Sequence, residues 1–344
     1  MATATATQPS TSFHPGLAPS FLKQGYLRTH SPERRSAAAA ATASGPVSTV
    51  TTIAIGGRPQ YVVVNAATNT FYSVDMYAKL SVIDGATNQI GPQFSVDTQS
   101  QGMAVNELTN MIYVCNWWDF ELGVVNGATN QLVTQVPLNA TCWGAAVNPE
   151  TNTVFVSING NSGGVAVVDG STNALVKTIP MGVGSYYIAV NPVTNLVYTV
   201  IYDGAVSGFG LYVLDGATYR IKTRIPLDIN ACGVAVNPVT NTVYATSLME
   251  SAVQVIDGAT NQVTGSITVG GYPQVVVVNP VLNRVYTANY WNNNVSVIDG
   301  NSNAVIQTVG VGQGPEGICT DPVTGVLYVA NTYGSTLTVL QDNG

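Results

Sequence analysis

The chain has 344 residues, of which 46% are hydrophobic and only 8% are charged. Because ordinary domains carry roughly 25% charged residues, the polar surface of this chain must come from Asn, Thr, Ser, Gln and Gly, a composition that favours β-structure with many turns. The net charge of −7 argues against a nucleic-acid partner, since phosphate binding depends on clustered Lys and Arg, and no stretch approaches the roughly 20 consecutive apolar residues that a membrane span requires.

Residues 1–46 differ from the rest of the chain in composition. They consist mainly of Ala, Thr, Ser and Pro and lack hydrophobic periodicity, so we expect a disordered leader. A secretory signal needs an apolar core of about 7 to 15 residues, and the alanines at 37–41 are too few and too weakly apolar to serve. The composition also fits an organelle transit peptide, a plain flexible leader or a wrongly chosen start codon, which leaves the localisation undetermined.

A motif of the form Asn-x-x-Thr-Asn recurs along the rest of the chain and divides it into seven units. The copies occupy residues 65–69, 106–110, 148–152, 191–195, 237–241, 279–283 and 321–325. Successive copies start 41, 42, 43, 46, 42 and 42 residues apart, and a period in this range is typical of propeller blades. The seventh copy begins with Asp321 and ends with Gly325 instead of Asn.

A second motif, Asp-Gly-Ala-Thr-Asn with close variants, follows the first, as at residues 84–88 and 257–261. Both motifs predict turns, because Pro presets φ, Gly accepts φ > 0, and Asn or Asp side chains bond nearby backbone amides. Between the turns, apolar and polar residues alternate as in strands. Each unit therefore predicts four short antiparallel strands, placed in the first unit at residues 60–65, 70–75, 79–84 and 89–96.

The last unit ends after its third strand, at residues 335–341, and lacks an outer strand. Residues 47–56 precede the first inner strand and are similar to the outer strands at 263–270 and 305–312. We expect this segment to pair into the seventh blade and close the ring, which removes the edges of an open sheet. The predicted fold class is all-β: one seven-bladed β-propeller over residues 47–344.

The second strands carry a shared four-residue pattern, as in Tyr113-Val-Cys-Asn116, Tyr286-Thr-Ala-Asn289 and Tyr328-Val-Ala-Asn331. This pattern resembles the repeats of the YVTN β-propeller family, and the resemblance covers all seven units. It implies an extracytoplasmic, surface-layer-like protein with a binding or structural role, with catalysis in relatives of the broader propeller superfamily. The fourth position departs from Asn in units 1, 3, 4 and 5, so a role shared by that position is not implied there.

The predicted topology separates two faces of the disc. Both repeated motifs lie on one face, here called the turn face. The opposite face, here called the variable face, contains the turns after the second strands and the connections that enter the inner strands. Its predicted aromatic binding residues are Tyr77, Trp117, Trp118, Phe120, Trp143, Tyr186, Tyr202, Tyr272, Tyr290, Trp291 and Tyr333.

Exposed aromatic patches are typical of recognition surfaces. Units 6, 7, 1 and 2 are neighbours in a closed ring, so their aromatic residues predict one arc along one side of the variable face. Its members are Tyr290, Trp291, Tyr333, Tyr77, Trp117, Trp118 and Phe120. The alternative is that several of these rings pack between blades and only seal the disc.

One equivalent position in each inner strand predicts a ring around the mouth of the central channel. It is occupied by Gln60, Gln101, Trp143, Tyr186, Cys232, Gln274 and Glu316. Near the closure of the ring, Glu316, Gln60, Gln274, Arg58 and Asp75 form a cluster that can orient a polar ligand. A solvated polar rim explains the same residues equally well.

The sequence restricts the chemistry of the body. Both histidines, His14 and His30, lie in the leader, which excludes histidine-dependent nucleophilic catalysis in the propeller. If the chain is an enzyme, the candidate catalytic residues are Glu316, Asp75 and Arg58.

Some residues near the variable face are also candidates for a metal site or a disulfide. Oxygen ligands that suit Ca²⁺ occur at Asp75, Asn116, Asn289, Asn331 and Glu316, but such Asn residues usually bond the backbone, and we predict no metal and no cofactor. Cys115 and Cys142 are predicted to approach each other near the variable face, and a disulfide between them is left open.

These observations favour a monomeric, non-catalytic recognition or scaffold protein. Its partner would be a protein, a glycan or a small molecule held on the aromatic, acidic variable face. The alternative is a histidine-independent lyase, isomerase or hydrolase that acts on a small molecule at the channel mouth. A surface-layer-like structural protein is a third hypothesis.

Overall fold

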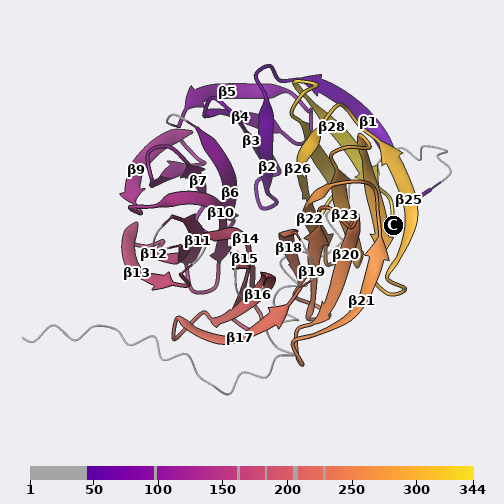
Figure 1. The fold of residues 1–344 in the computed structure, drawn as a ribbon. Helices are drawn as coiled ribbons and strands as arrows, with labels where there is room; N and C mark the ends of the chain where they lie inside the picture. Colours follow the sequence, from indigo (N-terminus) through magenta and orange to yellow (C-terminus); the bar gives the residue numbers. More distant parts are fainter. Residues whose placement is uncertain (1–44, 97–98, 161–162, 183, 204–207, 228–229) are drawn as a thin grey trace, which may run out of the picture.

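The computed structural model describes residues 45–96, 99–160, 163–182, 184–203, 208–227 and 230–344 (Figure 1). Within these ranges the chain forms seven four-stranded antiparallel sheets and no helix. The sheets are arranged as blades around a central axis, which confirms the predicted seven-bladed propeller. The leader predicted over residues 1–46 lies outside the described residues up to position 44. Among the residues described, no helix is long and apolar enough to cross a membrane.

The strands follow each other from the axis to the rim in each blade. Blades 1 and 2 comprise β2 (Pro59–Asn65), β3 (Thr70–Asp75), β4 (Lys79–Asp84) and β5 (Ile90–Ser95), then β6 (Ser100–Asn106), β7 (Met111–Asn116), β8 (Glu121–Asn126) and β9 (Gln131–Pro137). Blades 3 and 4 comprise β10 (Thr141–Asn148), β11 (Thr153–Asn159), β12 (Gly164–Asp169) and β13 (Ala174–Pro180), then β14 (Gly184–Asn191), β15 (Leu196–Asp203), β16 (Gly208–Asp215) and β17 (Arg220–Pro226).

The remaining blades repeat this order, with one exception at the rim of the last. Blades 5 and 6 comprise β18 (Ala231–Asn237), β19 (Thr242–Ser247), β20 (Ala252–Asp257) and β21 (Gln262–Thr268), then β22 (Pro273–Asn279), β23 (Arg284–Asn289), β24 (Asn294–Asp299) and β25 (Ala304–Gly310). Blade 7 comprises β26 (Pro315–Thr320), β27 (Val326–Asn331), β28 (Thr336–Asp342) and, as its outer strand, β1 (Val47–Ala54).

The ring closes as predicted, through β1. This strand pairs antiparallel with β28, from Val47 opposite Asp342 to Ala54 opposite Thr336. Figure 1 shows the indigo strand β1 beside the yellow blade 7. Gln307 of β25 adds a second attachment, because its side-chain amide accepts from Val47 N at 2.9 Å and donates to Val47 O at 2.7 Å. The closing strand is therefore bonded to blade 7 and to blade 6.

The tyrosine that opens the repeated second-strand pattern lies between blades. Its side chain is fully buried in six blades, at Tyr72, Tyr113, Tyr198, Tyr244, Tyr286 and Tyr328. At three junctions the hydroxyl donates to the next blade, from Tyr244 to Asn303, from Tyr286 to Asp342 and from Tyr328 to Asn88. The tyrosine thus combines apolar burial with a polar bond that joins neighbouring blades.

Blade 3 replaces this tyrosine by Phe155, and its partner position in blade 4 changes too. Asn occupies that position in the turns of blades 1 and 6, whereas blade 4 has Tyr219. The two rings contact each other edge to face, with their centroids 6.2 Å apart. A ring-to-ring contact therefore occurs at this junction in place of the hydroxyl-to-amide bond made by Tyr244 and Tyr328.

We expect substitutions of Phe155 and Tyr219 to be energetically coupled. Phe155→Tyr alone places a buried hydroxyl against the Tyr219 ring and should destabilise the protein by about 1–3 kcal/mol. Tyr219→Asn alone removes the ring contact, although Asn tolerates the backbone φ of 57° at this position. The double variant restores the hydroxyl-to-amide pair, so its loss should be about 1 kcal/mol or more below the sum of the single losses in urea unfolding. Strictly additive losses would contradict the pairing.

Candidate functional site

The structure separates the two faces as the sequence predicts. On the turn face, the two motif turns of each blade touch, as where Gly85 N donates to Asn69 O at 2.9 Å. On the variable face, the turn after the second strand meets the connection that enters the inner strand. Met76 N donates to Arg58 O at 2.9 Å, and Tyr290 N donates to Tyr272 O at 3.1 Å. The side chains of both kinds of connection are therefore brought together above the blades.

The aromatic side chains of blades 2, 3 and 4 form one continuous run on the variable face. Trp118 packs edge to face on Trp117, with centroids 4.7 Å apart. Trp117 lies 6.0 Å from Trp143, which lies 5.5 Å from Tyr186. Trp118 is 60% exposed and donates from its indole nitrogen to Gln99, whereas the other three rings are half-buried. We call these four residues the tryptophan run.

A second run crosses blades 6 and 7. Trp291, which is 60% exposed, stacks on Tyr272 at 4.7 Å, and Tyr272 lies 5.8 Å from Tyr290. Tyr290 then contacts Tyr333 edge to face at 5.9 Å. The guanidinium of Arg58, from blade 1, lies 5.7 Å above the Tyr333 ring, a distance typical of cation–π contacts. We call these four aromatic residues the tyrosine run.

The ring contacts divide the predicted aromatic residues differently from the single arc expected over blades 6, 7, 1 and 2. The tryptophan run extends from blade 2 into blades 3 and 4, because Trp143 and Tyr186 stand at the channel mouth and connect to it. Tyr77 and Phe120, which belong to turns of the variable face, are 65% and 45% exposed. Tyr202 belongs to β15, but its side chain lies outside the described residues.

Two tyrosines that the sequence reasoning missed lie across the central channel. Tyr61 of β2 and Tyr187 of β14 come from blades on opposite sides of the axis, and their rings stack with centroids 6.1 Å apart. Burial raises the pKa of both hydroxyls. The detectable signal was the contrast with other blades, where the equivalent inner-strand residues are Gly102, Gly144, Gly233 and Gly317.

Glu316, on β26, contributes to the electrostatic environment of this tyrosine pair. Its carboxylate Oε2 is 2.8 Å from the hydroxyl of Thr332, which is also 2.8 Å from Pro59 O of blade 1. Burial raises the pKa of Glu316, and the bond from Thr332 only partly opposes this. The charge of Glu316 adds to the burial that raises the pKa of Tyr187, Tyr290 and Cys232, the last to about 12. Glu316, Tyr187, Tyr290 and Cys232 are therefore close enough to interact electrostatically, and we call these four groups the Glu316 cluster.

The other polar residues of the predicted cluster have distinct surroundings. Gln60 is 7% exposed, and its side-chain oxygen has no hydrogen-bond partner among the described residues, whereas Gln101 and Gln274 are half-buried. Asp75 holds the turn of its own blade, because its Oδ1 accepts from Tyr77 N and Lys79 N, both at 2.9 Å. Of the candidate catalytic residues, Glu316 is therefore the carboxylate that is not committed to a turn of its own blade.

The Asn and Cys residues considered for metal or disulfide sites bond other groups of the protein. Asn289 donates to Asn294 and Ser296, and Asn331 donates to Thr336 and Thr338, all within their own blades. Within the described ranges, no group of three or more His, Cys, Asp or Glu is arranged to hold a metal. Cys115 and Cys142 meet as predicted, but as free, buried thiols, and burial followed by the contact with Cys142 raises the pKa of Cys115.

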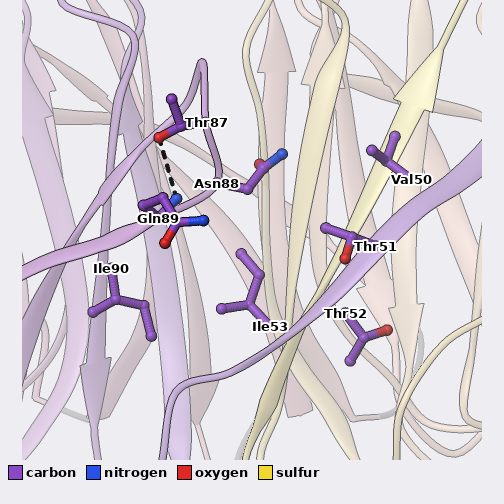
Figure 2. A pocket seen from close by; sticks show the side chains of 8 residues that line it. All are labelled: Val50, Thr51, Thr52, Ile53, Thr87, Asn88, Gln89 and Ile90. Atoms are coloured by element: carbon purple, nitrogen blue, oxygen red, sulfur yellow. Dashed lines mark hydrogen bonds between the residues drawn. The ribbon is translucent and has the colours of Figure 1, made fainter.

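A groove of about 510 Å³ lies elsewhere, on the outer side of the seam between blades 7 and 1. Figure 2 shows its walls, formed by residues 50–53 of β1 and by residues 87–90 of the β4–β5 turn and β5. The lining has threonine, amide and aliphatic side chains and no ionisable group. The groove therefore has fewer groups suited to binding or catalysis than the variable face, which carries the two aromatic runs and Glu316.

The fold is that of seven-bladed β-propeller proteins. Among solved structures, the chain is similar to a chain of hydrazine synthase from Kuenenia stuttgartiensis, with a TM-score of 0.75 over 83% of this chain and 95% of that chain. Sequence identity is 16%, so the similarity shows the fold alone. No protein family model and no curated protein sequence matches the chain. Membership of the YVTN family therefore stays a prediction.

We expect the tyrosine pair in the channel to stabilise the ring through packing. Tyr187→Ala leaves the Tyr61 ring without its partner and should reduce the free energy of unfolding by about 3 kcal/mol, as for other buried aromatic truncations. Tyr187→Phe keeps the stacked ring and should cost less than about 1 kcal/mol. Urea unfolding measures both. Equal losses for the two variants would show that the hydroxyl, and not the stacking, matters.

Proposed function

We propose that the chain is a non-catalytic recognition protein of the YVTN propeller type that holds a partner against its variable face. The observation that carries this proposal is the asymmetry of the disc. The turn face repeats the same residues from blade to blade, whereas all four tryptophans belong to the variable face, where Trp118 and Trp291 are each 60% exposed. Exposed, pre-packed aromatic rings of this kind are typical anchors of a binding surface. By the same resemblance, we propose a monomer with an extracytoplasmic location.

The Glu316 cluster supports a partner that presents a cation or a hydrogen-bond donor. Glu316 and the unpaired oxygen of Gln60 are both acceptors, and within the described part of the chain no ion pair joins Glu316 to Lys or Arg. The faces of Tyr187 and Tyr290 add negative π-density. Arg58 above Tyr333 already makes such a contact within the chain. An amine or guanidinium group on a protein, a glycan or a small molecule fits this environment.

Intrinsic fluorescence tests the location of binding, because every tryptophan lies on the proposed face. Lysine- and arginine-containing peptides, amino sugars, neutral oligosaccharides and small amines would be screened for a change in emission, and the ligands found would be titrated by calorimetry. We expect Trp118→Ala or Trp291→Ala to weaken binding at least tenfold, which is about 1.4 kcal/mol. Leu108→Ala is the matched control, because Leu108 is 66% exposed on the turn face. Unchanged affinity in both tryptophan variants would refute the aromatic anchors.

A histidine-independent lyase, isomerase or hydrolase at the channel mouth is the second candidate. The observation that favours it is the raised pKa of Glu316, a property that general acid–base groups use. The similar hydrazine synthase is an enzyme, so this fold is compatible with catalysis.

Glu316→Gln separates the two candidates once a ligand is known. For an enzyme, we expect turnover to fall at least a hundredfold, the usual contribution of a general acid or base, while a neutral ligand still binds. For a recognition protein, the same substitution weakens only cationic ligands. Asp75→Asn is the control, because Asp75 serves its own turn. Turnover that survives Glu316→Gln intact would remove Glu316 from the catalytic role.

A further inference from the structure

The turn face contains a chain of side-chain hydrogen bonds that runs from blade to blade. In five blades the first Asn of the repeated motif donates from its amide to the last Asn of the motif in the next blade. The five bonds join Asn65 to Asn110, Asn106 to Asn152, Asn148 to Asn195, Asn191 to Asn241 and Asn237 to Asn283, at 2.7–2.8 Å. This regular chain is interrupted at both sides of blade 7.

The two interruptions have different causes. Between blades 6 and 7, Gly325 replaces the acceptor, and the amide nitrogen of Asn279 has no hydrogen-bond partner in the part of the chain that the structure describes. Between blades 7 and 1, Asp321 replaces the donor. There, Oδ2 of Asp321 and Oδ1 of Asn69 are both buried, and both lack a hydrogen-bond partner among the described residues.

Asp321 is held in the same orientation as the asparagines that it replaces. Its Oδ1 accepts from Val323 N at 2.7 Å and from Thr324 N at 3.3 Å. In blade 4, Oδ1 of Asn191 likewise accepts from the amides two and three residues further on, at 3.0 and 3.3 Å. With Oδ1 used by its own turn, Oδ2 of Asp321 occupies the place of the donating amide nitrogen.

An ionised carboxylate is unfavourable at this place. It can only accept hydrogen bonds, so its Oδ2 would meet another acceptor, and Asp321 is 0% exposed to water. A neutral carboxylic acid carries one donor, which supplies the bond that the asparagines supply elsewhere. Burial raises the pKa of Asp321, and the amides of Val323 and Thr324 oppose this.

The charged and titratable groups around Asp321 raise its pKa further, stay uncharged or are already paired with other side chains. The charge of Glu107, at the β6–β7 turn, also raises the pKa of Asp321, by less than burial does. Cys319, on β26, has a pKa raised mainly by burial and stays an uncharged thiol. Asp342 bonds to the same turn through its backbone, and its carboxylate is paired with Arg284 and Tyr286.

We propose that Asp321 is protonated in the closed ring and that its Oδ2–H donates to Oδ1 of Asn69, so that a proton completes the junction between blades 7 and 1. This junction lies at the seam that β1 closes. Loss of the proton removes the bond and leaves a buried charge facing an oxygen, which weakens the seam. The ring thus contains a pH-sensitive latch that is independent of the proposed binding function.

The direction of the pH effect follows from proton binding. The folded chain binds the proton at Asp321 more tightly than the unfolded chain, whose Asp titrates near pH 4. The stabilisation is therefore complete below about pH 4 and is lost as the pH rises through the higher value of the folded state. Asn at this position donates its bond at any pH.

The test compares the full chain with Asp321→Asn by urea unfolding between pH 4 and pH 9. We expect the variant to have an unfolding constant at least tenfold smaller than the wild type at pH 9, with the difference disappearing toward pH 4. Infrared difference spectra, wild type minus Asp321→Asn, should show the carbonyl band of a neutral carboxylic acid in the folded wild type at a pH above 5. A difference in stability that does not change with pH, or the absence of this band, would overturn the proposal.

Two further variants keep the test informative if Asp321→Asn folds poorly. Asn237→Asp places a carboxyl at a regular junction and should introduce the same loss of stability with rising pH. Asn69→Gly removes the acceptor at a position with a φ of 50°, which Gly tolerates, and should abolish most of the advantage of Asp321→Asn. If added Na⁺ or Ca²⁺ stabilises the wild type at neutral pH but not Asp321→Asn, a cation and not a proton joins the two oxygens, and the proposal fails.

Discussion

The antiparallel pairing of β1 with β28 is the interaction on which the rest of the structure depends. Each blade buries the side chains of its sheet against the next blade, and this burial is complete for every blade only if the ring is closed. The pairing of Val47 with Asp342 at one end of β1 and of Ala54 with Thr336 at the other joins segments that are nearly the whole chain apart. Gln307 bonds the same strand to blade 6, so β1 is attached both to β28 of blade 7 and to β25 of blade 6.

Closure also explains why the two faces differ. On the turn face, the last Asn of the repeated motif adopts a positive φ, at 50° in Asn69 and 52° in Asn195. At five of these positions the side chain also accepts a hydrogen bond from the preceding blade, as Asn195 does. These demands on backbone and side chain leave little freedom for other residues. The described turns of the variable face instead carry the large rings of the tryptophan and tyrosine runs. We therefore place the proposed recognition on this face.

Blade 7 contains both the closing strand pair of the ring and a carboxyl group of the candidate site. Its inner strand β26 carries Glu316 near the variable face, and Asp321 follows it on the turn face. Burial raises the pKa of both carboxyl groups. Thr332 bridges Glu316 to Pro59 of blade 1, and in the proposed junction Asp321 bonds to Asn69 of the same blade. The proposed sensitivity of the ring to protons is thus located at the seam between blades 7 and 1.

Strand positions, blade number, closure and the separation of the faces were all predictable from sequence, because turns depend on Asn, Pro and Gly within a few residues and the period repeats them. The approach of Cys115 to Cys142 followed from the same topology. The stacking of Tyr61 on Tyr187 and the contact of Phe155 with Tyr219 were not predictable, because each joins side chains from two blades and depends on distances that exist only once the ring has closed. The bonds of Asp75 to its own turn are local, but the sequence pattern did not decide between this role and a role in the site. Local backbone chemistry therefore determined the architecture, whereas the packing between blades decided how the aromatic residues divide into two runs and which carboxyl groups lose contact with water.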